Sequence, residues 1–128
     1  DTPYLTISSQ CTLTGTRSGA SVAGTYAVMR YLGKEGYRQI VDRCMKLTHL
    51  LLEEVKKIGV NPVIDPLMNI VALSVSEPKK IRKELATQFG WQVSITKHPS
   101  SIRLVVMPHM TEENIIAFVQ DLKTVLNS

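Results

Sequence analysis

Apolar residues recur at steps of three and four between Tyr37 and Ile58, in the longest amphipathic pattern of the chain. The positions are Ile40, Cys44, Leu47, Leu51, Val55 and Ile58. Because this spacing places them on one face of an α-helix, the segment predicts a helix with a single buried stripe. Gly59 follows directly and is a candidate for the helix C-cap.

A second helix is predicted before it, from about Ser18 to Tyr31. Its apolar positions are Ala20, Val22, Ala23, Ala27, Val28, Tyr31 and Leu32. We expect Gly33 to stop this helix and residues 34–36 to form a short break. Residues 2–14 are rich in hydroxyl side chains and are predicted to be extended or loop.

The second half of the chain alternates between strand and helix patterns. Residues 69–75 are apolar on both faces, which indicates an interior strand. A helix is expected to begin at Glu77-Pro78, to bury Ile81, Leu85 and Phe89, and to end at Gly90. Strands are predicted at 91–95 and 102–107, with a turn at 98–100. Since the connection is short, these two strands should pair antiparallel.

The last helix is expected to begin after Thr111, an N-cap followed by acidic residues. The predicted order is therefore helix, helix, strand, helix, strand, strand, helix. This order indicates the α/β class, as a small α+β domain. We expect a three-stranded, mainly antiparallel sheet covered by helices and preceded by a loop and long helices.

Composition narrows the functional classes. The chain has 128 residues, of which 44% are hydrophobic, 20% charged and 5% aromatic, and its net charge is +4. Its basic residues are dispersed and its aromatic residues few, so nucleic-acid binding is not expected. It has no apolar run long enough to cross a membrane. The spacing of Cys11 and Cys44 matches no disulfide framework, which predicts a reducing compartment, the cytoplasm.

Two features are candidates for metal or anion binding. Cys44 and His49 share a predicted helix but are five residues apart, which is not a metal-ligand spacing, so no metal is expected. The turn at residues 12–19 combines two glycines with hydroxyl side chains and Arg17. A turn of this kind at a helix N-terminus can hold an anion. The alternative is an ordinary capped helix start with a solvated arginine.

Arg103 stands inside an otherwise apolar predicted strand. A charge in that setting must be paired or must face a cleft. It could form a salt bridge to a helix glutamate, or reach the sheet edge with its long side chain. It could instead receive the carboxylate of a small substrate. The pattern alone leaves these alternatives open.

Several motifs together resemble one family. They are Thr12–Ala20, Tyr26–Tyr37, Pro66–Ala72 and Ile102–His109. They are similar to the C-terminal part of the archaeal L-tyrosine/L-aspartate decarboxylases, a branch of the group II decarboxylases that depend on pyridoxal 5′-phosphate. The resemblance covers nearly the whole chain. It implies a fold-type-I enzyme that is a homodimer with active sites at the subunit interface.

The resemblance also implies that a cofactor domain lies upstream and is absent from this chain. The family binds its cofactor to the lysine of an Asp-x-His-Lys motif, and the nearest string here is Thr96-Lys97-His98-Pro99. We therefore expect a piece of a longer chain that contains no catalytic residue itself. Residues 1–33 would link to the missing cofactor domain and include the phosphate-contacting turn. Residues 34–128 would be the C-terminal small domain.

Two residues take their roles from the resemblance. Thr16 matches the hydroxyl residue that reaches the cofactor phosphate across the dimer, and Arg103 matches the arginine that holds the substrate α-carboxylate. Arg17 also matches the motif and is a weaker candidate without an assigned role. Ser18 stands where relatives have proline, so the geometry of this turn could differ.

The implied activity is the conversion of L-tyrosine to tyramine or of L-aspartate to β-alanine, with release of carbon dioxide. The expected partners are an amino-acid substrate and either a second copy of the full-length enzyme or the missing upstream domain. The alternative function is a stand-alone α/β module that binds a ligand or a protein without catalysis.

Overall fold

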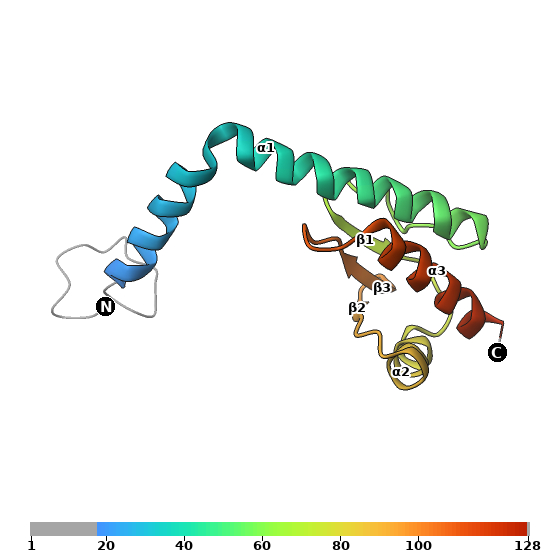
Figure 1. Cartoon of the computed structure of the whole chain (residues 1–128). Helices are drawn as coiled ribbons and strands as arrows, with labels where there is room; N and C mark the ends of the chain where they lie inside the picture. The colour runs from blue at the N-terminus through green and yellow to red at the C-terminus, as the bar shows by residue number, and fades with distance from the viewer. Residues whose placement is uncertain (1–17, 128) are drawn as a thin grey trace, which may run out of the picture. The chain divides into compact units, whose positions relative to one another are not determined.

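The computed structural model describes residues 18–127, which fall into two units that divide between Tyr37 and Arg38 (Figure 1). The elements, in order, are α1 (Gly19–Lys57), β1 (Ile70–Leu73), α2 (Pro78–Phe89), β2 (Ser94–Lys97), β3 (Ser100–Val105) and α3 (Glu112–Leu126). The predicted α/β class is confirmed, with three strands and helices that cover them. No helix in this described range is long and apolar enough to cross a membrane.

Helix α1 contains the two predicted helices in one element. Its backbone departs from helical geometry at Gly33, where φ is 58° and ψ is −173°. This combination of angles is essentially restricted to glycine. The predicted break at residues 34–36 is wrong, because these residues are helical and the interruption is confined to Gly33.

The end of α1 follows the prediction. Gly59 has a φ of 80°, and its N–H donates to the carbonyl of Lys56 at 3.0 Å. The N–H of Val60 donates to the carbonyl of Val55, also at 3.0 Å. This pair of bonds is the Schellman arrangement, which satisfies the last carbonyls of a helix. The chain then turns toward the sheet.

The sheet has the order β1-β3-β2, and both pairings are antiparallel (Figure 1). The antiparallel pairing of the last two strands is thus confirmed. The expectation that the first strand is interior is wrong, because β1 lies at an edge. Residues 61–63 cover that edge: the N–H of Val63 donates to the carbonyl of Ala72 at 2.8 Å, and that of Ser74 to Asn61 at 2.9 Å. This cover explains why a strand with apolar residues on both faces is stable at an edge.

The bounds of the other strands shift for local reasons. β2 begins at Ser94 rather than Trp91, because the N–H of Trp91 closes the end of α2 by donating to Leu85 at 3.0 Å. β3 ends at Val105, because Val106 and Asn69 exchange two hydrogen bonds. The N–H of Val106 donates to the Asn69 carbonyl at 2.8 Å, and the Asn69 side chain donates to the Val106 carbonyl at 2.7 Å.

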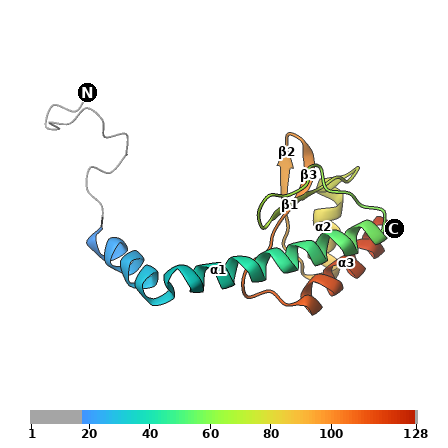
Figure 2. The ribbon, with the colours of Figure 1, turned by 90° about the horizontal axis from the view of Figure 1, so that it is seen from above.

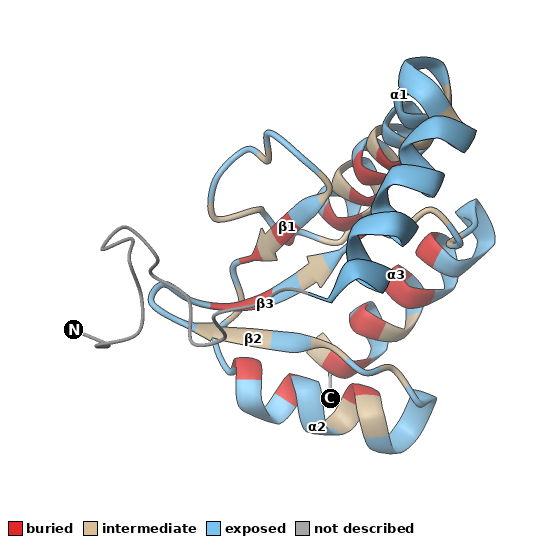
Figure 3. Cartoon of the chain, turned by 90° about the vertical axis from the view of Figure 1, so that its left-hand side faces the viewer, coloured by how far each residue is buried: buried red, intermediate tan, exposed pale blue. Residues whose placement is uncertain are grey.

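The helices of the second unit lie on one face of the sheet (Figure 3). Figures 1 and 2 both place α3 alongside the part of α1 that follows residue 38. The buried core is formed by residues from α1, from both other helices and from alternate positions of the strands: Leu47, Leu51, Val55, Val71, Leu73, Ile81, Leu85, Ile102, Phe118 and Leu122 are among them. The opposite face of the sheet carries no helix of this unit.

Candidate functional site

The three site residues predicted from the sequence fall in different parts of the chain. Thr16 and Arg17 lie outside the residues that the structure describes. Arg103 is described and lies in β3, the central strand of the sheet. The candidate site is therefore built around Arg103.

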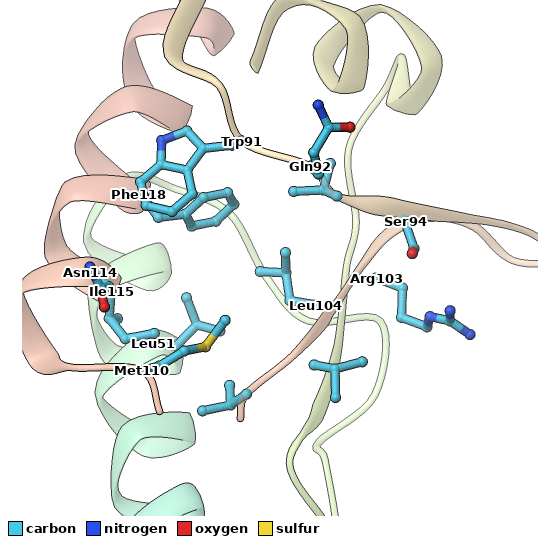
Figure 4. A pocket seen from close by; sticks show the side chains of 13 residues that line it. Leu51, Trp91, Gln92, Ser94, Arg103, Leu104, Met110, Asn114, Ile115 and Phe118 are labelled. Atoms are coloured by element: carbon cyan, nitrogen blue, oxygen red, sulfur yellow. The ribbon is translucent and has the colours of Figure 1, made fainter. Parts of the chain in front are cut away.

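Strand alternation places the Arg103 side chain on the helix-free face. Its neighbours Ile102 and Leu104 are buried and half-buried and belong to the core side, whereas Arg103 is exposed. Figure 4 shows Arg103 and Leu104 leaving the strand on opposite sides. The charge is therefore tolerated inside an apolar strand, because the guanidinium is not placed in the core.

The residues beside Arg103 on the sheet are small. In the strand register, Arg103 is opposite Ala72 of β1 on one side and opposite Ser94 of β2 on the other. Directly paired residues of an antiparallel sheet place their side chains on the same face. Ala72, Arg103 and Ser94 therefore form one row, in which no large neighbour covers the guanidinium.

Arg103 has no ion pair or side-chain hydrogen bond to any residue within 18–127. The ion pairs found there join Arg38 to Asp42 at 3.6 Å, Lys80 to Glu84 at 3.9 Å, and Lys57 to Glu54. The alternative of a salt bridge to a helix glutamate is thus not realised in this structure. As far as the described residues are concerned, all five N–H donors of the guanidinium are available to a ligand.

Apolar side chains adjoin Arg103 on the same face. Ile70 is 51% exposed and Val105 is 37% exposed, and the two are paired across β1 and β3. Both alternate with core residues, so they project from the helix-free face with Arg103. A cation bordered by apolar surface is a suitable receptor for a carboxylate, because a covering layer would strengthen the ion pair by excluding water.

The next row of the same face consists of two hydroxyl residues that bond to each other. The hydroxyls of Thr96 and Ser101 are 2.5 Å apart, and that of Thr96 also donates to the carbonyl of Pro99 at 2.6 Å. The Ser94 hydroxyl, by contrast, makes no hydrogen bond with any residue that the structure describes. Ser94 and Arg103, which lack side-chain partners among the residues described, are therefore neighbours on this face.

A cavity of about 220 Å³ lies near the start of β2. Its apolar lining consists of Leu51, Trp91, Val93, Leu104, Val105, Val106, Met110, Ile115 and Phe118. Arg103 and Ser94 also border it, but the guanidinium points away from the aromatic pair of Trp91 and Phe118 (Figure 4). The cavity and the cation thus lie on different sides of β3.

Trp91 fixes the aromatic wall of this cavity. Its ring meets that of Phe118 edge to face, with centroids 5.6 Å apart and an interplanar angle of 87°. Its indole N–H donates to Asp121 Oδ2 at 2.7 Å. This contact joins residues 30 positions apart in the sequence, and no local pattern predicts it.

Metal chemistry finds no support in the described part of the chain. Between residues 18 and 127, no group of three or more His, Cys, Asp or Glu side chains is placed to hold a metal ion.

Comparisons with known proteins identify the relatives of this chain. It is 58% identical over 98% of its length to the probable L-tyrosine/L-aspartate decarboxylase of Methanosarcina barkeri. It is 48% identical, also over 98% of its length, to the probable L-aspartate decarboxylase of Archaeoglobus fulgidus. The matched region is 32% of the first relative and 34% of the second, so the chain spans about a third of their length. No family model matches the chain.

Two solved structures share this fold over most of the chain. The sphingosine-1-phosphate lyase of Burkholderia pseudomallei matches 90% of this chain, and 27% of its own, with a TM-score of 0.78 and 25% identity. The glutamate decarboxylase of Lactobacillus brevis matches 90% of this chain, and 29% of its own, with a TM-score of 0.71 and 19% identity. The resemblance to the archaeal L-tyrosine/L-aspartate decarboxylases is thus confirmed, over nearly all of this chain and about a third of theirs.

Proposed function

We propose that this chain is part of a pyridoxal-phosphate-dependent amino-acid decarboxylase that acts on L-tyrosine or L-aspartate and that it supplies the receptor for the substrate α-carboxylate. The single observation that carries the proposal is Arg103, an exposed guanidinium without a protein partner in the described residues, on the helix-free face of the sheet. The names of the relatives, which specify tyrosine and aspartate, support the choice of substrates.

Arg103 is suited to bind and orient the substrate α-carboxylate, which leaves as carbon dioxide. A planar guanidinium can donate two parallel hydrogen bonds to the two oxygens of a carboxylate. This pairing fixes the plane of the carboxylate and hence the direction of the Cα–carboxyl bond. The position of Arg103 in the middle of β3 supports precise placement, because both flanking strands hold its backbone.

The bound cofactor would supply the electron sink for the bond cleavage. We propose that Thr16 donates a hydrogen bond to its phosphate, and that Arg17 is a weaker candidate for the same region. A hydroxyl beside glycines at the start of a helix is chemically suited to a phosphate. The Schiff-base lysine would come from outside these 128 residues, because no Asp-x-His-Lys motif occurs in them.

The proposed enzyme places two parts of this chain in different roles. Residues 1–33 would connect to the cofactor domain and carry the phosphate contact, and residues 34–128 would form the small domain that carries Arg103. The full-length enzyme would be a cytoplasmic homodimer. The exposed face around Arg103 would then be covered by the cofactor domain, which would exclude water from the ion pair.

The test is steady-state kinetics of the longer, cofactor-loaded protein with Arg103→Met and Arg103→Lys. Both variants should raise KM for the amino acid and lower kcat, because a lysine cannot reproduce the two parallel hydrogen bonds. Arg82→Met removes an exposed arginine of α2 and is the matched control, with activity expected to stay unchanged. Wild-type kinetics for Arg103→Met would contradict the carboxylate role, provided that circular dichroism shows an intact fold.

A further inference from the structure

The neighbour of Arg103 on β2 offers a second donor to the same ligand. Ser94 and Arg103 are direct partners in the β2–β3 register, so their side chains project on the same face of the sheet. Both residues are exposed. Figure 4 shows the Ser94 hydroxyl on the side of the sheet toward which Arg103 points.

The hydroxyl residues of this face differ in what they bind. Thr96 and Ser101 are two positions further along the same strands, and their hydroxyls are 2.5 Å apart. Thr96 in addition donates to the Pro99 carbonyl at 2.6 Å, so this pair stabilises the hairpin. Ser94 has no such partner within residues 18–127 and contributes no side-chain bond to the hairpin. Its hydroxyl is therefore available to a ligand that Arg103 holds.

A carboxylate bound by Arg103 has acceptor sites left over. The two parallel bonds from the guanidinium use one lone pair on each oxygen, and a carboxylate has about four such sites. Because the arginine side chain is long and flexible, a carboxylate bound by it alone can change its orientation. A third donor beside the guanidinium would hold the carboxylate in one orientation. Ser94 lies on one side of Arg103 in the row, and Ala72, which has no donor, lies on the other.

We propose that Ser94 is a second substrate-binding residue, whose hydroxyl donates a hydrogen bond to the α-carboxylate that Arg103 holds. This inference rests on the proposed function. It assigns Ser94 to the recognition of α-carboxylates in particular. Ligands that lack this group, such as the amine product, gain nothing from the Ser94 hydroxyl.

The test compares two ligands of the longer, cofactor-loaded protein by calorimetry, without relying on turnover. The first is the hydroxy acid that corresponds to the preferred substrate, which is malate for aspartate or 4-hydroxyphenyllactate for tyrosine. It keeps the α-carboxylate but has no amine. The second is the amine product, β-alanine or tyramine, which has lost the α-carboxylate.

Ser94→Ala should weaken the binding of the hydroxy acid by about ten- to a hundredfold, the usual effect of losing a hydrogen bond to a charged group. Binding of the amine should stay unchanged. Ser94→Thr, which keeps a hydroxyl in a residue that strands accept well, should restore most of the affinity. Ser100→Ala is the matched control, because Ser100 is an exposed serine of the same hairpin on the opposite face, and it should change neither affinity.

The outcomes separate this inference from the proposed function. If Ser94→Ala leaves the hydroxy acid unaffected while Arg103→Met weakens it, the role of Ser94 is wrong and the carboxylate receptor stands. If Ser94→Ala weakens both ligands equally, Ser94 has only a structural role and the inference is again wrong. If Arg103→Met also leaves the hydroxy acid unaffected, the proposed function fails, and the inference fails with it.

Discussion

At the scale of single residues, Arg103 shows how a strand can carry a charge between apolar neighbours. Ile102 is fully buried on the core side, while Arg103 projects from the other face, beside Ala72 and Ser94. Successive side chains of a strand point to opposite faces of the sheet, so these two adjacent residues lie in different environments. The charge therefore imposes no desolvation cost on the core, and the guanidinium stays free to bind an anion.

Thr16 leads to a prediction about the cofactor. Thr16→Ala in the longer protein should weaken pyridoxal-phosphate binding more than it slows turnover, because it removes the proposed donor to the phosphate. A hydrogen bond to a charged group contributes about 1.5–3 kcal/mol, which corresponds to roughly a ten- to a hundredfold change in dissociation constant. Equilibrium dialysis of the cofactor measures it, with Thr12→Ala as a hydroxyl control from the same turn. An unchanged affinity would make Thr16 a structural turn residue.

At the residue level, the sequence singles out a position that contrasts with its surroundings. Arg103 could be identified because it is the charged residue of an apolar run. Ser94 could not, because a serine in an alternating strand is ordinary, and its proposed role depends on its partner in the register. The bond between Trp91 and Asp121 likewise depends on how α2, β2 and α3 pack, which no local pattern encodes.

At the scale of elements, helix ends decide where the structure departs from the predicted bounds. Gly59 and Gly90 end their helices with positive φ, as their positions after an apolar stripe predict. Gly33 also has a positive φ, yet α1 continues past it, because the residues that follow have helical geometry. A glycine thus predicts a change of backbone angle reliably, but whether the helix resumes depends on the sequence after it.

The N-terminus of α3 supports a prediction about stability. The Thr111 side chain accepts from the N–H of Asn114 at 3.3 Å, and the Asn114 side chain accepts from the N–H of Thr111 at 3.1 Å. Thr111→Ala removes one of these reciprocal bonds and should lower the free energy of unfolding by about 1 kcal/mol. Urea denaturation measures it. Thr87→Ala, on the exposed side of α2, is the control. Equal stability of the two variants would contradict the capping role.

The same cap gives α3 a dependence on pH. The Thr111 hydroxyl and the backbone N–H of Glu113 both hold the pKa of the Glu113 carboxyl below its usual range. A lowered folded-state pKa stabilises the fold above the unfolded-state pKa, and this contribution is lost as pH falls through the folded-state pKa. In Thr111→Ala the pKa of Glu113 should therefore rise, as an NMR titration of its side chain can measure. An unchanged pKa would show that the backbone N–H of Glu113, without the Thr111 hydroxyl, lowers the pKa of the Glu113 carboxyl.

At the scale of the whole molecule, the chain carries the proposed substrate contact but not the lysine motif that the family uses for covalent chemistry. It spans about a third of the length of its curated relatives, and it contains no Asp-x-His-Lys motif. These 128 residues alone should therefore show no decarboxylase activity, and no single lysine should take up pyridoxal phosphate stoichiometrically. Absorbance and mass spectrometry measure this uptake. Substrate-sensitive uptake on one lysine would contradict the proposed division of roles.

The fold of the second unit could be predicted largely because its core is encoded locally. The stripes of α1 and α3 follow from spacing alone, as does the burial of Ile81 and Leu85 in α2. Phe89, which is expected in the same stripe of α2, is exposed. The edge position of β1 could not be predicted from its apolar pattern. Residues 61–63 cover that edge, and their own pattern does not resemble a strand. The hydrogen bonds between this loop and the edge of β1 depend on the assembled sheet.

The first part of α1 has no core of its own, and this leads to the last prediction. Every residue from Gly19 to Arg30 is exposed. They include large apolar side chains such as Val22, Tyr26 and Met29, which are 62%, 63% and 57% exposed. A short helix without tertiary packing is marginal in water. By contrast, Leu47, Leu51 and Val55, in the later part of α1, are buried.

Amide hydrogen exchange should separate these two parts of α1. The experiment uses the 128-residue chain under conditions in which sedimentation shows a monomer. Residues 19–31 should then exchange much faster than residues 44–55, because opening the first part exposes no buried surface. In the longer protein, where the proposed cofactor domain would cover the apolar side chains, residues 19–31 should become protected. Equal protection of both parts in the monomer would show that the first part of α1 is stable without a partner. The need for a covering domain would then be refuted.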